Sequence, residues 1–107
     1  MSVKKEVMEN LAEAMKAIYT FDVGEKFTVV DLMVLAEVYC KPGITLTETM
    51  NKFAGVVPLT TIQNSFIGFD RNGLIDKKPH PTEYRAKAIF LNKKGEELIS
   101  RITGALK

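Results

Sequence analysis

The side chains best suited to recognition chemistry gather between residues 59 and 72. Five of the hydrogen-bonding or cationic side chains there are candidates: Thr60, Thr61, Gln63, Asn64 and Arg71. On a helix that turns about 100° per residue, their common face is polar and almost uncharged. A Gln or Asn amide in this position can pair bidentately with adenine, and the threonines can meet phosphates or base edges. The alternative is an ordinary solvated helix face.

A second candidate surface is the basic stretch over residues 70–94. It holds seven Lys or Arg against three Asp or Glu, whereas the formal charge of the whole chain is only +2. Such concentration of charge is typical of a surface that contacts a polyanion, although lysine and arginine also cover solvated loops. The side chains expected to make this contact are Lys77, Lys78, His80, Arg85 and Lys87.

Little in the sequence points to catalysis. The chain has one cysteine and one histidine, Cys40 and His80, and neither has a partner at metal-ligand spacing. No nucleophile stands beside a base, and no glycine-rich loop could cradle a phosphate. We therefore expect no enzymatic activity, no metal and no cofactor. We expect Cys40 to act as a small apolar residue at a helix end.

The apolar runs are short, far below the roughly 20 residues that a membrane-spanning helix needs. Residues 1–6 are not followed by an apolar stretch of the kind found in secretory signals. We therefore expect a cytoplasmic protein. Its five methionines could line an effector pocket, but methionine more commonly fills a core, so nothing here supports a small-molecule effector.

Hydrophobic spacing predicts one domain over residues 1–107, mainly α with a small β-hairpin. The predicted helices span about residues 3–19, 29–40, 46–53, 59–72 and 93–106, and the predicted strands about 74–78 and 85–91.

Caps and turns mark the ends of these elements. Thr28 and Thr45 each have an acid three residues later and are expected to cap helices, as is Asn92. Gly24 and Gly73 are expected to end helices or form turns.

In the fourth predicted helix, four residues are expected to face the core: Leu59, Ile62, Phe66 and Phe69. Ile67 should face outward, where it could pack on a thymine methyl or on a neighbouring protein. Gly68 costs about 1 kcal/mol relative to alanine in a helix. Its presence therefore suggests a close backbone approach, to a phosphate or to another helix.

The order of the elements is that of a winged helix-turn-helix. Two helices precede a helix-turn-helix pair, over about residues 46–53 and 59–72, and a hairpin with a basic loop follows. Thr47, in the first helix of the pair, is a further candidate contact to a phosphate backbone.

Residues 73–98 carry a more specific signal. They contain a Gly-Leu-Ile entry at residues 73–75, a proline-containing tip, an acid-x-Arg formed by Glu83 and Arg85, and a Leu-polar-x-Lys-Gly exit at residues 91–95. Together these features resemble the wing of MarR-family transcriptional regulators.

The resemblance extends over about residues 28–102 and implies a sequence-specific regulator that binds double-stranded DNA as a homodimer. It also implies that Glu83 orients Arg85, which would enter a minor groove. In the family, aspartate is usual at the position of Glu83 and a charged residue at that of Tyr84. The helices predicted at residues 3–19 and 93–106 are the expected dimerisation elements. The alternative function is a winged helix that binds proteins without reading DNA sequence.

Overall fold

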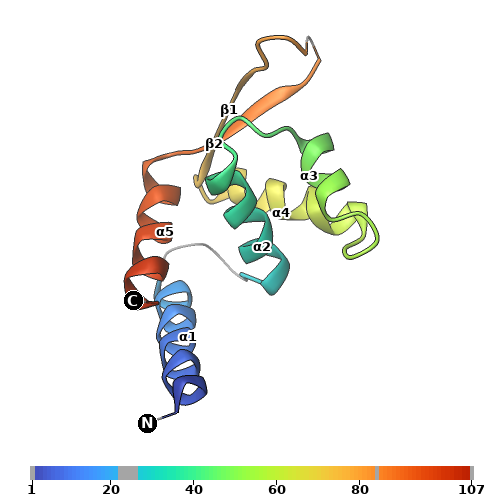
Figure 1. The fold of residues 1–107 in the computed structure, drawn as a ribbon. Coiled ribbons are helices and arrows are strands. Elements are labelled where there is room, and N and C mark those ends of the chain that lie inside the picture. Colours follow the sequence, from blue (N-terminus) through green and yellow to red (C-terminus); the bar gives the residue numbers. More distant parts are fainter. Residues whose placement is uncertain (1, 22–26, 84, 107) are drawn as a thin grey trace.

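The computed structural model describes residues 2–21, 27–83 and 85–106. Its elements, in chain order, are α1 (Val3–Thr20), α2 (Val29–Cys40), α3 (Leu46–Lys52), α4 (Leu59–Arg71), β1 (Ile75–Pro79), β2 (Lys87–Leu91) and α5 (Lys93–Ala105). Figure 1 shows this mainly helical chain with its single projecting hairpin. The predicted fold class is confirmed. Gly24 and Tyr84 lie outside the described residues.

Three helices begin where the sequence predicts a cap. The hydroxyl of Thr28 accepts a hydrogen bond from the backbone N–H of Asp31, and the hydroxyl of Thr45 accepts one from that of Glu48, which completes a capping box in each case. The side chain of Asn92 accepts from the backbone N–H of Gly95. The capping predictions are therefore confirmed, and they explain why these helix bounds follow the sequence closely.

The core lies where α2, α4, α5 and the base of the hairpin meet. Its most deeply buried large side chains come from all of these parts: Val34, Leu35, Val38, Ile62, Leu74 and Leu98. Gly95, in the first turn of α5, lies so close to the residue before β1 that an added Cβ would overlap the carbonyl oxygen of Leu74. The hairpin and α5 are thus packed together at their junction.

The hairpin is an antiparallel pair in which Ile75 faces Leu91 and Pro79 faces Lys87. The second strand was predicted to begin at Arg85, but that residue lies in the turn before β2. The first strand was predicted to stop before Pro79, which instead is its last residue. The N–H of His80 donates the next bond of the ladder, to the carbonyl of Ala86. Because bonded pairs alternate in an antiparallel ladder, the neighbouring Pro79 needs no N–H of its own and is tolerated there.

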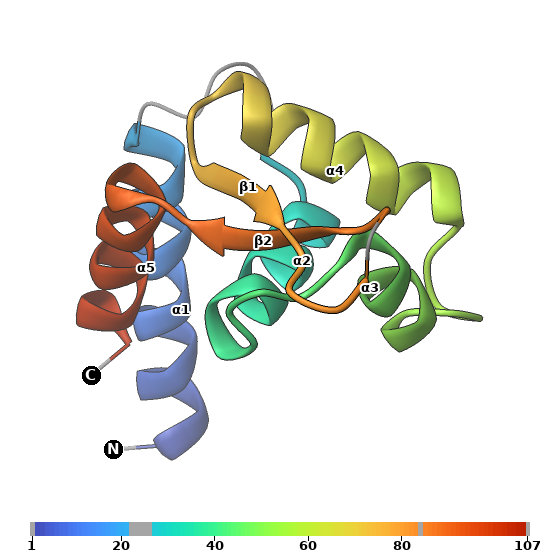
Figure 2. The ribbon, with the colours of Figure 1, turned by 90° about the horizontal axis from the view of Figure 1, so that it is seen from above.

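α1 and α5 lie side by side (Figure 2), and both add buried side chains to the core that α2 and α4 form. Ala14 and Ile18 of α1 are buried, and the N-terminal half of the helix extends away from the rest of the chain (Figure 1). Its exposed apolar side chains include Val3, Val7, Met8 and Leu11. Leu106, predicted to join the apolar stripe of the last helix, follows α5 and is exposed. None of the described helices is long and apolar enough to cross a membrane.

Candidate nucleic-acid interface

α4 is held firmly on one side and open on the other. Ile62, Phe66 and Phe69 are buried, and the two phenylalanine rings meet edge to face with centroids 6.1 Å apart. Three of the four predicted core contacts of this helix are therefore confirmed. The prediction for Leu59 is wrong, because its side chain is 54% exposed. Burial in α4 begins at Thr61 and Ile62, so the elements that cover the rest of the helix leave Leu59 uncovered at its start.

A hydrogen bond fixes α4 against α2. The hydroxyl of Ser65, which is buried, donates to Oδ1 of Asp31 at 2.6 Å. The other carboxylate oxygen, Oδ2, accepts the backbone N–H of Thr28 at 2.8 Å. Asp31 thus caps α2 and positions α4 at the same time. Sequence reasoning assigned Asp31 only the capping role, because spacing along the chain says nothing of a partner 34 residues away.

The predicted recognition side chains lie on the open side of α4. Thr60, Gln63, Asn64 and Arg71 are exposed, and Thr61 is partly buried. Ile67 stands among them with 54% of its surface exposed. A Cβ at Gly68 would meet nothing within 4 Å, so no other helix of the described chain approaches it. Two amides, hydroxyls and an apolar group therefore face solvent together.

The lysines of the hairpin are exposed on both strands. Nζ of Lys77 in β1 lies 3.7 Å from Oδ2 of Asp70 near the end of α4, which ties the hairpin to that helix. The Lys78 ammonium lies 5.4 Å from the centroid of the Phe90 ring. Lys87 is exposed at the start of β2. The structure thus gathers these three cations on one narrow ribbon.

His80 organises the tip of the hairpin. Its Nδ1 accepts the backbone N–H of Thr82 at 3.2 Å and that of Glu83 at 2.9 Å. A neutral imidazole that accepts at Nδ1 carries its proton at Nε2, which leaves one donor unused by these bonds. Among the described residues no ion pair joins Glu83 to Arg85, and Arg85 is exposed. The tip is therefore shaped by His80 and not by the expected acid-arginine pair.

α3 lies on the side of the molecule toward which the hairpin tip extends (Figures 1 and 2). Thr47, in its first turn, is exposed. The backbone N–H and the hydroxyl of Thr45 hold the pKa of Glu48 below its ordinary value, and the nearby charge of Lys41 lowers it further. The side chain of Glu48 thus remains ionised and keeps the start of α3 capped.

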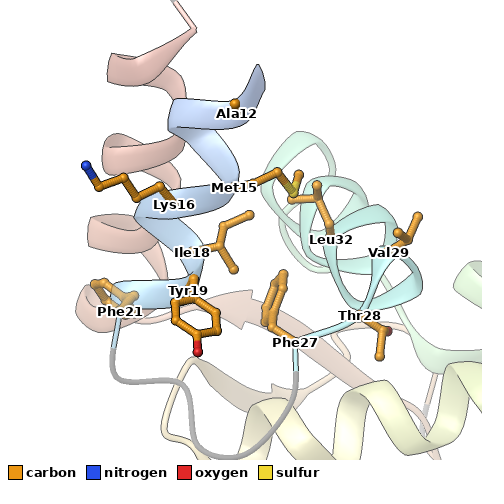
Figure 3. A pocket seen from close by; sticks show the side chains of 10 residues that line it. All are labelled: Ala12, Met15, Lys16, Ile18, Tyr19, Phe21, Phe27, Thr28, Val29 and Leu32. Atoms are coloured by element: carbon orange, nitrogen blue, oxygen red, sulfur yellow. The ribbon is translucent and has the colours of Figure 1, made fainter. Parts of the chain in front are cut away.

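An open pocket of about 840 Å³ separates the end of α1 from the start of α2. Figure 3 shows Met15 and Ile18 of α1 on one side and Phe27 and Leu32 on the other. Thr28 also lines this pocket, and its N–H is bonded to Asp31. The pocket wall therefore includes the helix turn that supports Ser65 of α4.

The described residues contain no group of three or more His, Cys, Asp or Glu that could hold a metal ion. Cys40 is the last residue of α2, as expected for a helix end, but it is exposed and not packed as a small apolar residue.

The fold matches those of solved transcriptional regulators. The regulator Tm0710 from Thermotoga maritima superposes with a TM-score of 0.78 at 18% sequence identity, covering 97% of this chain and 69% of that chain. A mutant MepR from S. aureus, bound to an oligodeoxyribonucleotide, gives a TM-score of 0.72 at 17% identity and covers 95% and 69% of the two chains. A mutant MarR from E. coli, complexed with operator DNA, gives 0.70 at 16% identity and covers 96% and 66%.

No protein-family model matches the sequence, and no curated protein matches it either. The chain nevertheless has the fold of MarR-family transcriptional regulators over almost its whole length. The resemblance noted in residues 73–98 is thereby confirmed as a likeness of fold.

Proposed function

We propose that this protein is a transcriptional regulator that binds double-stranded DNA sequence-specifically. In this proposal α4 lies in the major groove, and the β1–β2 hairpin contacts the adjacent backbone and minor groove. One observation carries the proposal: α4 is anchored by its apolar side while it presents an uncharged hydrogen-bonding face, and Asp70 ties it to the cationic hairpin through Lys77.

The face of α4 has the groups that base reading requires. The exposed amides of Gln63 and Asn64 can each donate to and accept from one adenine edge. Thr60 and Thr61 stand in the first turn, where their hydroxyls can meet a phosphate. Because Phe66 and Ser65 fix the helix, the amides would approach the duplex in a constant orientation.

The hairpin supplies positive charge beside that helix. Lys77, Lys78 and Lys87 would lie along the phosphate backbone, and His80 could add its Nε2–H as a donor. Arg85, exposed at the tip, is our candidate for insertion into the minor groove, where a narrow groove concentrates negative potential. Thr47 of α3 would contact the backbone from the other helix of the pair. The DNA-bound MarR and MepR structures support the proposal through their common fold with this chain.

We further propose that the protein acts as a homodimer. The N-terminal half of α1 exposes Val3, Val7 and Met8 by 74%, 55% and 61%, and a second copy packed on this side would cover them. α1 and α5 would then be the dimerisation elements of a single winged-helix domain. A twofold dimer would read two half-sites separated by about 10 base pairs or a multiple of that.

The test is a fluorescence-anisotropy titration of random-sequence duplex DNA, followed by selection of the tightest duplexes from that pool. We expect binding that weakens steeply with salt. Replacing Arg85 and Lys87 together by alanine should lower the affinity and make the log–log salt slope less steep by about 2. The matched control is Lys4→Ala with Lys5→Ala in the first turn of α1, which should leave the slope unchanged.

Asn64→Ala should instead change the base preference found by selection and leave the salt slope nearly as it was. A protein that binds no duplex even at low salt would contradict the proposal. That result would favour the alternative function, a winged helix that binds another protein, for which exposed Ile67 is the best candidate contact.

A further inference from the structure

We infer that α4 selects A·T-rich half-sites, and that it does so through thymine methyl groups as well as adenine edges. The inference deepens the proposed DNA-binding function and rests on it. It starts from the side chain that the helical pattern assigned to the core and the structure exposes, Leu59.

Leu59, Gln63 and Ile67 form one row along α4, each four residues from the next. Leu59 and Ile67 are both 54% exposed, and Gln63 between them is exposed too. At 1.5 Å per residue, the row is about 12 Å long, which corresponds to roughly three base-pair steps of about 3.4 Å. An amide that reads adenine would thus have an apolar group about one helical turn away on either side.

The chemistry of the major groove assigns partners to this row. Thymine is the only standard base with a methyl group there, and apolar side chains recognise it by contact. Adenine is the base that a Gln or Asn amide matches bidentately. Leu59 and Ile67 therefore suit thymine methyls, while Gln63 and Asn64 suit adenine.

The groups that read G·C pairs are missing from the same surface. Residues 59–69 contain no Lys, Arg, Asp or Glu, although Arg and Lys are the usual readers of guanine and acids can accept from cytosine. Charged residues appear only in the last turn, where Asp70 is paired with Lys77 and Arg71 is exposed. Guanine recognition would therefore be confined to Arg71, at one end of the helix.

The spacing of these apolar groups also distinguishes DNA from a protein partner. Protein-binding patches are contiguous and have an apolar centre. Here the polar side chains of Thr60, Gln63 and Asn64 stand between Leu59 and Ile67. A row of single apolar groups separated by amides fits the edges of successive base pairs better than a protein surface.

The experiment begins with duplexes of 30 base pairs selected from a random pool by the full-length protein. We expect runs of A·T pairs at the positions that α4 covers. The tightest duplex is then made again with uracil in place of thymine, which removes only the methyl groups from the major groove. We expect the affinity for each half-site to fall about fifteenfold, since one buried methyl is worth about a fourfold change and two are in contact.

Two variants test whether α4 causes this loss of duplex affinity. Ile67→Ala and Leu59→Ala should each bind the thymine duplex more weakly but lose only about fourfold on uracil substitution, because one of two methyl contacts is already gone. Val29→Ala, which removes the same kind of exposed apolar surface from α2, should retain the full loss of about fifteenfold. All three positions are exposed, so folding is preserved, and melting curves check this.

Equal binding of the thymine and uracil duplexes would overturn the inference, and so would selected sites with G·C pairs opposite residues 59–67 of α4. Either result leaves the proposed DNA-binding function intact. A protein that selects no duplex from the pool would overturn that function and the inference with it.

Discussion

α4 and the β1–β2 hairpin differ in how the chain holds them in place. α4 is fixed by residues distant in sequence: its rings pack in the core, and Ser65 is bonded to Asp31, 34 residues earlier. The hairpin tip is held by its own neighbours, chiefly through His80 and the two backbone N–H groups that follow it. The position of α4 depends on the whole fold, whereas the shape of the hairpin tip depends on a few adjacent residues.

The difference matches the two tasks that we propose for these elements. Base reading needs donors and acceptors placed to within a fraction of an ångström, which favours an element locked by tertiary contacts. Phosphate binding is long-ranged and tolerant of orientation, which a locally held, charged ribbon satisfies. Changes that loosen α4 should therefore reduce stability and specificity, whereas changes in the hairpin should reduce affinity alone.

The largest effect is expected for Phe66→Ala. This ring is 4% exposed and packs against Phe69, so its loss should lower the free energy of unfolding by about 3–5 kcal/mol. The comparison variant, Thr82→Ala at the exposed hairpin tip, should change it by less than about 0.5 kcal/mol. Urea unfolding measures both. Similar losses in the two variants would contradict the contrast between the elements.

Ser65→Ala should come next. It removes the donor to the Asp31 carboxylate and should lower the free energy of unfolding by about 2 kcal/mol. Because the hydroxyl orients α4, the ratio of specific to non-specific duplex affinity should also fall, with the salt slope unchanged. Ser100→Ala, at an exposed site of α5, is the control. An unaltered specificity ratio would limit Ser65 to a structural role.

Gly68→Ala separates stability from binding. A Cβ at this position meets nothing within 4 Å, so alanine should stabilise the helix by about 1 kcal/mol. If the DNA backbone approaches Gly68, one of the two possibilities that the sequence suggested, the same methyl should weaken duplex binding. Gly104→Ala in α5 has equally open surroundings and should stabilise the fold without affecting DNA. Equal duplex affinity in the two variants would show that no such approach exists.

The smallest effect is expected at His80. His80→Ala leaves two backbone N–H groups without their acceptor and should lower duplex affinity only a few-fold, with base preference and stability nearly unchanged. His80→Asn offers a side-chain carbonyl to the same groups and should restore the affinity. If asparagine binds as weakly as alanine, the ring contacts DNA directly and does not act through the loop.

The sequence was sufficient for the parts of the fold that depend on neighbours along the chain. Thr28, Thr45 and Asn92 each cap a helix as expected, because a cap and its partner are three residues apart. Periodicity likewise placed Ile62, Phe66 and Phe69 in the core. These are local signals, and no knowledge of the tertiary structure is required to interpret them.

The errors occur where tertiary packing decides. A helical wheel gives the direction of Leu59 but not how far the covering elements extend, and they leave Leu59, the first residue of α4, uncovered. The hydrogen bond between Ser65 and Asp31 joins two helices, and the sequence of neither helix shows a pattern that would reveal it. At the hairpin tip, the register of β1 and β2 places Arg85 in the turn, which alternation of residues could not reveal.

The most direct test of the central claim is an NMR titration of the full-length protein with a selected duplex, following backbone amides. The account predicts that amides of α4 (residues 59–71) and of the hairpin (residues 77–87) shift together along one binding curve, while those of α1 and α5 stay nearly unchanged. Shifts confined to only one of the two elements, or centred on α1, would contradict it.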